Sequence, residues 1–472
     1  MFYGGGAAVV QCLFDNGTLV WNGSDMPVLA AAVPELFKFD ERTMNFRSRA
    51  CDYAKIQLKA QALGVPVDDR AAAFKQISDL NLQETLIPRP HQKTAFEAWR
   101  KNSYRGVAAL PTGSGKTILA VMAIARLKRS TLVLVPTIDL LTQWANVLEK
   151  FFKRPIGMWG GGSSTTEDIT VSTYNSAVLK MEFYGNCFAC LIADECHHLP
   201  GPANRLAAEW AIAPYRLGLS ATPESDAERD AVLTDLMGEL CCRIQIDELS
   251  KGILSDYDVE TVELNLTPQE EQAYILNRKI YTDFLRQHHI VMSSVHAWRN
   301  FIMEVAKSGW AGKKAFEAYL KQKSIARGGE EKLSMLWQLL CRHAGERIII
   351  FTADNATAYE IGRRYLLPVL THHTKSAERK NMLENFRVGD CPVLVSSKVL
   401  NEGVDVPEAN IGIIVSGGAG VREHVQRLGR ILRAKPGKKA VLYELVNSST
   451  SELNILTRRR EHRAYQTKIR GD

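Results

Sequence analysis

The sequence has 472 residues, of which 46% are hydrophobic and 24% are charged, and this composition excludes a disordered or fibrous chain. A chain of this length holds about three domains of ordinary size. Its nine cysteines are too few and too scattered for a disulfide scaffold, and the N-terminus is a poor secretory signal. No apolar run approaches the ~18 residues that cross a bilayer. We therefore expect a cytoplasmic, reduced, multidomain protein.

The net charge of +7 is unevenly distributed along the chain. Residues 1–90 hold 9 Lys/Arg and 10 Asp/Glu, a balance of −1, whereas residues 340–472 hold 22 and 14, a balance of +8. A one-sided basic excess fits a polyanionic partner such as nucleic acid. A solvated basic tail over residues 451–472 would explain the same numbers, so charge alone leaves both interpretations open.

The N-terminal part, residues 1–84, reads as a small α+β domain with a polar linker. Apolar residues in 9–14 and 18–21 flank Asp15-Asn16-Gly17, which predicts a hairpin. Residues 49–63 then read as a helix that stops at Gly64.

From residue 85 the pattern changes to α/β alternation. The apolar runs 107–110, 131–135 and 188–193 are typical of buried parallel strands, which predicts a doubly wound lobe over 85–250. A second lobe over 251–450 opens with a strand at 259–266. A helical, basic and aromatic-rich insertion follows at about 268–332. Further strand candidates lie at 347–351, 393–395 and 411–415.

A glycine-rich segment, Leu-Pro-Thr-Gly-Ser-Gly-Lys-Thr at 110–117, lies between a predicted strand and a predicted helix. Gly113 and Gly115 allow backbone N–H groups to surround phosphates at the helix N-terminus. Lys116 would reach the β- and γ-phosphates, and the Thr117 hydroxyl would bind Mg²⁺. Leu110 replaces the first glycine of the general pattern. The strand–helix setting favours a phosphate-binding loop for ATP over an ordinary glycine-rich turn.

A pair of acidic residues, Asp194 and Glu195, follows the third predicted strand, 78 residues beyond Lys116. Ligands of open α/β sheets bind at this end of the strands. We expect Asp194 to hold Mg²⁺ and Glu195 to polarise the attacking water. An isolated Asp-Glu after a strand is common, and the P-loop before it is what supports the assignment.

Nearby cysteines and histidines raise the alternative of a zinc site. We do not expect one, because Cys190 lies inside a predicted buried strand and Cys196 and His197 belong to the Mg²⁺ motif. The residues considered are Cys187, Cys190, Cys196, His197 and His198.

The ordered motifs together resemble those of superfamily 2 helicases, and the closest resemblance is to the XPB-type DNA helicases in their compact archaeal and bacterial forms. The motifs are the Arg-Pro-His-Gln at 89–92, the P-loop, Asp-Glu-Cys-His at 194–197, Ser-Ala-Thr at 220–222 and the run at 426–433. The likeness is densest from residue 87 to about 452. It implies two RecA-like lobes, a thumb-like insertion at 268–332 and a damage-recognition-like domain at 1–84.

The resemblance also implies roles for particular residues. Gln92 would read adenine, and Gly403 and Asp405 would face the nucleotide across the interlobe cleft. The nucleotide-binding set is Arg89, Gln92, Thr112, Gly113, Ser114, Gly115, Lys116, Thr117, Gly403 and Asp405. Nucleotide state would be coupled to DNA by Ser220, Ala221, Thr222 and Gln426.

Arg430 and Arg433 would be arginine fingers at the γ-phosphate. Residues three apart share one face of a helix, so two guanidinium groups can converge on one phosphate. Taken alone, such a pair is more often a solvated face.

The resemblance further implies DNA contacts at the positions where this superfamily grips the phosphate backbone, and hydroxyls and amides suit such sequence-independent contacts. These positions are Pro136, Thr137, Gln143, Ser172, Thr173, Tyr174, Thr371 and His372. Tyr174 could equally belong to the core.

These observations predict an ATP-driven DNA helicase that uses Mg²⁺. The resemblance implies that it moves 3′ to 5′ and acts in DNA repair. One alternative is a duplex-DNA translocase that serves a nuclease partner without separating strands. Another is an ATP-gated clamp on DNA lesions. RNA is a less expected substrate, because Asp-Glu-Cys-His differs from the Asp-Glu-Ala-Asp of RNA helicases.

One departure from the family concerns strand separation. Many XPB-type helicases have Arg-Glu-Asp shortly after the Ser/Thr-Ala-Thr motif, whereas here Ser225, Asp226 and Ala227 occupy that place. The nearest charged triplet, at 228–230, comes three residues later, a shift of about 300° around a helix. We therefore expect robust DNA-stimulated ATPase activity with weak unwinding of blunt duplexes.

Overall fold

The computed structural model describes residues 10–111, 114–221, 226–244, 256–292, 297–397, 409–416, 439–448 and 450. The chain divides into two compact units, Met1–Gln245 and Ile246–Asp472. Within the described parts of the chain, no helix is both long enough and apolar enough to cross a membrane.

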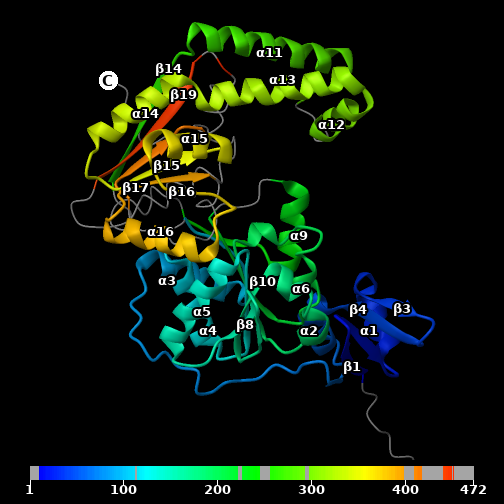
Figure 1. The fold of residues 1–472 in the computed structure, drawn as a ribbon. Coiled ribbons are helices and arrows are strands. Elements are labelled where there is room, and N and C mark those ends of the chain that lie inside the picture. The colour runs from blue at the N-terminus through cyan, green and yellow to red at the C-terminus, as the bar shows by residue number, and fades with distance from the viewer. Residues whose placement is uncertain are drawn as a thin grey trace, which may run out of the picture. The chain divides into compact units, whose positions relative to one another are not determined.

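The first unit begins with a small domain built on a five-stranded sheet in the order β3-β4-β2-β1-β5 (Figure 1). Asn16 and Gly17 take φ values of 47° and 76° between β1 and β2, as the predicted hairpin turn requires. The elements are β1 Val10–Asp15, β2 Thr18–Asn22, α1 Met26–Ala32, β3 Lys38–Asp40, β4 Asn45–Arg49, α2 Tyr53–Ala62 and β5 Val67–Asp69. The predicted helix at 49–63 starts only at Tyr53, because a 3-10 turn, Ala50–Asp52, precedes it.

The rest of the first unit, lobe 1, is a doubly wound α/β layer. Its eight strands have the order β13-β6-β12-β11-β7-β10-β8-β9, and every pair except β8–β9 is parallel. The strands are β6 Arg105–Ala109, β7 Thr131–Val135, β8 Gly157–Gly160, β9 Ser163–Thr165, β10 Ile169–Thr173, β11 Cys190–Asp194, β12 Tyr215–Ser220 and β13 Leu240–Arg243. The helices are α3 Pro90–Lys101, α4 Lys116–Leu127, α5 Ile138–Phe152, α6 Tyr174–Val178, α7 Met181–Tyr184, α8 Leu206–Glu209 and α9 Ala227–Met237.

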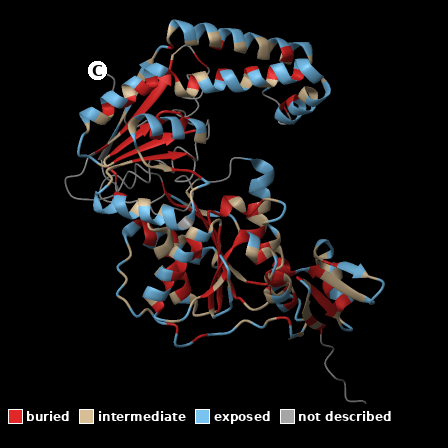
Figure 2. Cartoon of the chain, viewed as in Figure 1, coloured by how far each residue is buried: buried red, intermediate tan, exposed pale blue. Residues whose placement is uncertain are grey.

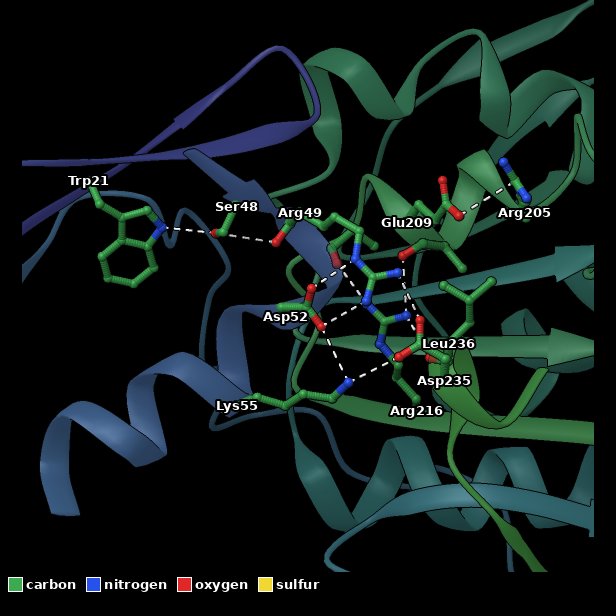
Figure 3. A network of polar contacts seen from close by, with 12 residues as sticks. Trp21, Ser48, Arg49, Asp52, Lys55, Arg205, Glu209, Arg216, Asp235 and Leu236 are labelled. Carbon is green, nitrogen blue, oxygen red and sulfur yellow. Dashed lines mark hydrogen bonds and ion pairs between the residues drawn. The ribbon is translucent and has the colours of Figure 1, made fainter. Parts of the chain in front are cut away.

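The small domain is joined to lobe 1 by packing and by ion pairs. Asp235 of α9 accepts hydrogen bonds from Arg49 at 2.8 Å and Lys55 at 3.0 Å (Figure 3). A side chain on Gly17 would come within 2.7 Å of the Trp210 ring, so only glycine fits there. Ile212 of lobe 1 belongs to the core cluster of the small domain.

A buried arginine, Arg216 on β12, holds together the backbone segments of lobe 1 that lie next to the small domain. Its guanidinium donates to the carbonyls of Ala208, Ala211, Ala213 and Leu236 at 2.6–3.1 Å. Burial, together with the nearby charge of Arg105, lowers the pKa of Arg216. These bonds fix the ends of α8 and α9 to the sheet.

The second unit contains a six-stranded parallel sheet in the order β14-β19-β18-β15-β17-β16. Its strands are β14 Asp256–Leu264, β15 Ile348–Thr352, β16 Val369–Leu370, β17 Val393–Ser397, β18 Ile411–Ile414 and β19 Lys439–Asn447. Leu333, Leu336 and Leu339 of α14 (Glu330–Arg342) pack on this sheet, which also contacts α15 (Asn355–Tyr365). A further helix, α16, spans Ser376–Val388. In each of the two α/β sheets the strands are largely buried, and the helices that cover them have exposed outer faces (Figure 2).

The helical insertion extends from this second sheet. Long helices α11 (Pro268–Gln287) and α13 (Gly309–Gly328) lie side by side, with α12 (Ala297–Lys307) at their far end (Figure 1). Thr267 and Glu270 form a capping box that starts α11. Phe284 and Phe301 form the centre of an aromatic cluster that holds the three helices together.

Candidate functional site

The predicted phosphate loop lies at the carboxyl edge of the lobe 1 sheet. Strands β6, β12 and β11 are neighbours, with Ala109 opposite Ser220 and Asp194 opposite Leu219. The segments after these three strands therefore emerge side by side, where open α/β sheets bind ligands. Helix α4 begins at Lys116, directly after the loop, and Thr117 is half-buried in its first turn.

Gly115 and Gln92 shape the end of this loop. Gly115 has φ +85°, a backbone conformation that favours glycine, and a Cβ there would lie 2.3 Å from the side-chain nitrogen of Gln92, which would have to move. Gln92 donates to the Ser114 carbonyl at 2.9 Å and accepts from the Arg89 backbone N–H at 2.9 Å. His91 contacts the same Ser114 carbonyl at 2.7 Å. The Arg-Pro-His-Gln motif thus supports the loop backbone, while adenine reading by Gln92 stays a prediction.

Lys116 and Glu195 meet in a buried ion pair. The Lys116 Nζ donates to the Glu195 Oε1 at 2.8 Å, and the two side chains are 10% and 5% exposed. Two residues 79 positions apart are therefore brought together, as the predicted ATP site requires.

Asp194, at the end of β11, is buried beside this pair. Its Oδ1 accepts the Glu195 backbone N–H at 3.0 Å, and its Oδ2 accepts the indole N–H of Trp144 at 2.8 Å. Burial raises the pKa of Asp194 to about 6, and the charge of Lys116 opposes that rise.

The loop after Asp194 connects to the end of β12. Glu195 takes the left-handed conformation at φ 45°, which is uncommon for a residue with a side chain and typical of functional loops. The next turn brings the His197 Nδ1 to 3.3 Å from the Ser220 Oγ, and both side chains are buried. Arg229 of α9 donates to the His197 carbonyl at 2.8 Å. Ser220 is therefore in contact with the acidic loop, and Ala221 follows it directly.

The expected DNA contacts of lobe 1 divide into two groups. Pro136, Thr137 and Gln143 are half-buried at the start of α5, where the Thr137 hydroxyl caps the helix. Thr173 caps α6 in the same way, but it is buried. Ser172 and Tyr174 are buried, and the Tyr174 hydroxyl donates to the Asp194 carbonyl at 2.9 Å. Tyr174 therefore belongs to the core, which is the alternative interpretation given above. Neither Ser172 nor Tyr174 has its side chain at the surface, where DNA could contact it.

The two expected contacts of the second unit follow β16. Thr371 is buried, and its hydroxyl contacts the Tyr359 hydroxyl at 2.9 Å. His372 is exposed and lies 3.2 Å from the Asn355 side-chain nitrogen.

Several predicted site residues lie outside the described residues. They are Thr112, Gly113, Thr222, Gly403, Asp405, Gln426, Arg430 and Arg433.

The cysteines near the acidic loop lie at opposite ends of β11. Cys190 lies within β11 and Cys196 is buried after it, whereas Cys187 precedes the strand. Over the described ranges, no three His, Cys, Asp or Glu side chains are grouped so that they could hold a metal ion.

Arg229 and Trp144 were not predicted as functional residues of this region, and His197 was placed in the acidic motif without a role of its own. His197 and Arg229 link the acidic loop to β12 and α9, and Trp144 contacts Asp194 directly. Trp144 follows Gln143 on the apolar face of α5, so the sequence pattern assigns it to the core. Only the order of strands β7 and β11, which the sequence does not reveal, places it beside Asp194.

Family models match three parts of the chain. Residues 85–225 match the res subunit of type III restriction enzymes, and residues 331–435 match the helicase conserved C-terminal domain. Residues 13–71 match the damage recognition domain of the xeroderma pigmentosum group B helicase.

Similar proteins include archaeal, bacterial and plant helicases. The DNA 3′-5′ translocase XPB2 of Sulfurisphaera tokodaii is 38% identical over 380 residues, which cover 80% of this chain and 86% of the relative. The DNA 3′-5′ helicase XPB of Mycobacterium tuberculosis is 27% identical over 86% of this chain and 69% of the relative. A transcription and DNA repair factor IIH subunit, XPB1 of Arabidopsis thaliana, is 26% identical over 81% of this chain and 50% of its own length.

Solved structures show the same fold at low identity. The Hef helicase domain of Pyrococcus furiosus matches with a TM-score of 0.51 at 20% identity, over 79% of this chain and 98% of that domain. Dbp5 of Saccharomyces cerevisiae, bound to RNA and ADP BeF3, matches with a TM-score of 0.54 at 17% identity. The match covers 79% of this chain and 87% of the Dbp5 chain. These matches confirm the RecA-like fold class. The 38% identity across most of both chains shows that this chain belongs to the XPB family of superfamily 2 DNA helicases and translocases.

Proposed function

We propose that the chain is an ATP-driven DNA motor that moves 3′ to 5′ along one strand and acts in DNA repair. One observation carries the proposal: the buried Lys116–Glu195 pair lies beside Asp194 and is connected through His197 to Ser220. The phosphate-binding lysine, the acidic loop and the strand end expected to respond to nucleotide therefore form one connected group. The relatives' names, helicase and translocase, support DNA as the track.

The residues of this edge fit Mg–ATP chemically. Gly115 turns the backbone at the N-terminus of α4, where N–H groups and the helix dipole favour phosphate. The Thr117 hydroxyl and the Asp194 carboxylate are oxygen ligands of the kind that Mg²⁺ prefers. Bound Mg²⁺ would neutralise charge on the β- and γ-phosphates. Lys116 would then hold phosphate oxygens, and Glu195, released from it, would orient the attacking water.

The remaining roles rest on the resemblance to the family. Arg430 and Arg433 would stabilise the transition-state charge, while Gly403 and Asp405 would contact the nucleotide from lobe 2. Gln426 and Thr222 would transmit the nucleotide state. For DNA, we propose contacts from Pro136, Thr137 and Gln143 in lobe 1 and His372 in lobe 2, because these residues are half-buried or exposed.

The relatives' names favour a motor over a lesion clamp, but translocation and strand separation need separate tests. ATP hydrolysis should be measured with single-stranded DNA, duplex DNA and RNA, alongside displacement of a labelled strand and of a protein block on duplex DNA. We expect DNA, but not RNA, to stimulate hydrolysis strongly. Hydrolysis unaffected by DNA would contradict the proposed motor, and stimulation by RNA alone would contradict its substrate.

A further inference from the structure

We propose that Trp144 is a positioning residue for Asp194, which holds the carboxylate in the orientation that binds Mg²⁺ with the nucleotide. This inference rests on the proposed ATP site and adds a residue that none of the recognised motifs includes. Trp144 lies on α5, whereas Asp194 ends β11, 50 positions further along the chain.

The geometry fixes the carboxylate from two sides. The Trp144 Nε1 donates to Oδ2 at 2.8 Å, and the Glu195 backbone N–H donates to Oδ1 at 3.0 Å. The Tyr174 hydroxyl holds the carbonyl of the same residue at 2.9 Å. With one donor on each oxygen, rotation of the carboxylate about its bond to Cβ would break both hydrogen bonds. The remaining lone pairs then point in fixed directions.

An indole suits this role because of its chemistry and its surroundings. Its N–H is a donor only, so it can hold a carboxylate but cannot compete with it for a cation. Trp144 is 2% exposed and packs with the apolar face of α5, which includes Leu140, Leu141 and Leu148. A ring held on this face cannot turn away from Asp194. Partners of this kind orient metal ligands in many sites, and their removal typically costs about 10–100-fold in metal affinity.

A plainer interpretation is that a buried indole simply satisfies its N–H with the nearest acceptor. Trp99 of the same lobe provides a matched control. It is fully buried, and its Nε1 donates at 2.8 Å to the Arg216 carbonyl. Arg216 lies four residues before Ser220 on β12, about 13 Å along the strand from the carboxyl edge. Trp99→Phe and Trp144→Phe therefore each remove one buried indole hydrogen bond, but only the second removes one from Asp194.

The test measures binding rather than activity. For wild type, Trp144→Phe, Trp99→Phe and Asp194→Ala, binding of a fluorescent ADP analogue is followed against Mg²⁺ concentration and in EDTA, and thermal unfolding is recorded. We expect both Trp→Phe variants to lose similar stability. Trp144→Phe alone should raise the half-saturating Mg²⁺ concentration, by about tenfold. Binding in EDTA should equal that of wild type.

Two results would overturn the role of Trp144: an unchanged Mg²⁺ requirement in Trp144→Phe, or an equal increase in Trp99→Phe. If Asp194→Ala itself kept the wild-type Mg²⁺ requirement, the proposed ATP site would fail as well, and this outcome is distinct from the first two. Should Trp144→Phe fail to fold, β-(3-benzothienyl)alanine at position 144 keeps the ring shape without the N–H, and the same expectation applies.

Discussion

At the scale of single residues, the Lys116–Glu195 pair places two opposite charges in a largely dry site. Removing one partner of a buried pair leaves the other charge uncompensated, which typically costs about 3–5 kcal/mol. Phosphate can replace the Glu195 carboxylate as the partner of Lys116 without leaving the ammonium unpaired. We therefore propose that the pair keeps the lysine in place and that its exchange for phosphate is the step that frees Glu195.

Lys116→Ala should abolish ATP hydrolysis and leave DNA affinity largely intact. Loss of one preorganised group that stabilises transition-state charge costs about 10²–10³ in kcat, whereas DNA affinity comes from phosphate contacts elsewhere. Steady-state ATPase assays and DNA-binding titrations check this, with Lys93→Ala, an exposed lysine on α3, as the charge-matched control. Hydrolysis within tenfold of wild type would contradict the P-loop assignment.

The residue types of the ATP site were predictable, but several of its contacts were not. Glycines, a lysine and a pair of carboxylates that follow predicted strands indicate phosphate and Mg²⁺ chemistry by their residue types alone. The sequence was therefore enough to select Gly115, Lys116, Asp194 and Glu195. Hydrogen bonds between distant elements depend on strand order and side-chain direction. Trp144 contacts Asp194 for that reason only, and so does His197 contact Ser220. Tyr174 was undecided until its burial was known.

At the scale of elements, composition located the strands that are apolar throughout. The run 131–135 coincides with β7, and Thr267-Pro268 marks the start of α11. Strand β12 went unpredicted because Arg216 interrupts its apolar pattern, and only the four carbonyls around the guanidinium make its burial possible. Strand β10 was treated as a DNA-contacting segment for its hydroxyls, which the structure buries in the sheet.

Helix α9 is attached at both ends to functionally distinct parts of the first unit. Near its start, Arg229 holds the His197 carbonyl of the acidic loop. Near its end, Asp235 binds Arg49 and Lys55 of the small domain (Figure 3). The helix therefore contacts both the acidic loop and the damage-recognition-like domain. The contacts at each end lead to a separate prediction.

Arg229→Ala should lower kcat for DNA-stimulated ATP hydrolysis by about fivefold, because one hydrogen bond from a charged group, worth ~1 kcal/mol or more, positions the His197 turn. DNA affinity should not change. Glu228→Ala, an exposed charge one residue earlier, is the control. Arg229→Lys should recover part of the rate, since the ammonium still donates to a carbonyl. An unaltered kcat in Arg229→Ala would show that the contact has no part in hydrolysis.

The Arg49–Asp235 pair should contribute a salt-sensitive coupling free energy of about 0.2–1 kcal/mol between the small domain and lobe 1. A double-mutant cycle of Arg49→Ala and Asp235→Ala, followed by chemical unfolding at low and high salt, measures it. The Arg205–Glu209 pair, which lies entirely within lobe 1, is the control.

The same pair predicts a pH dependence. Burial raises the pKa of Asp235, but the hydrogen bonds from Arg49 and Lys55 outweigh it and leave that pKa below its usual value. The folded state therefore binds fewer protons than the unfolded state in acid. The contribution of the pair should be complete at neutral pH and disappear as acidification protonates Asp235. A coupling energy that persisted in acid would contradict this assignment.

At the scale of the whole chain, a helicase needs an element that separates the DNA strands in addition to the proposed ATP site. The family triplet Arg-Glu-Asp is absent from its usual place, where Asp226 instead accepts the Glu228 and Arg229 backbone N–H groups and caps α9. The charged residues at 228–230 lie in the first turn of this helix, and Arg229 is bound to the His197 carbonyl. Because Arg229 is engaged with the acidic loop, we expect it not to replace the family triplet at a DNA fork.

We therefore expect the protein to hydrolyse ATP robustly with DNA and to unwind blunt duplexes weakly. A 3′ single-stranded tail should improve unwinding, because a motor that moves 3′ to 5′ then starts on a strand that is already separated, and opening the first base-pair steps, at about 1.4 kcal/mol each, is no longer required. Matched duplexes with blunt ends, a 3′ tail or a 5′ tail, assayed for strand displacement and for ATP hydrolysis in the same reactions, distinguish the possibilities. Equal unwinding of the two tailed substrates would contradict the polarity. Efficient unaided unwinding of the blunt duplex would show that the charged triplet is dispensable and that α9, with Arg229 held at His197, leaves strand separation to another part of the chain.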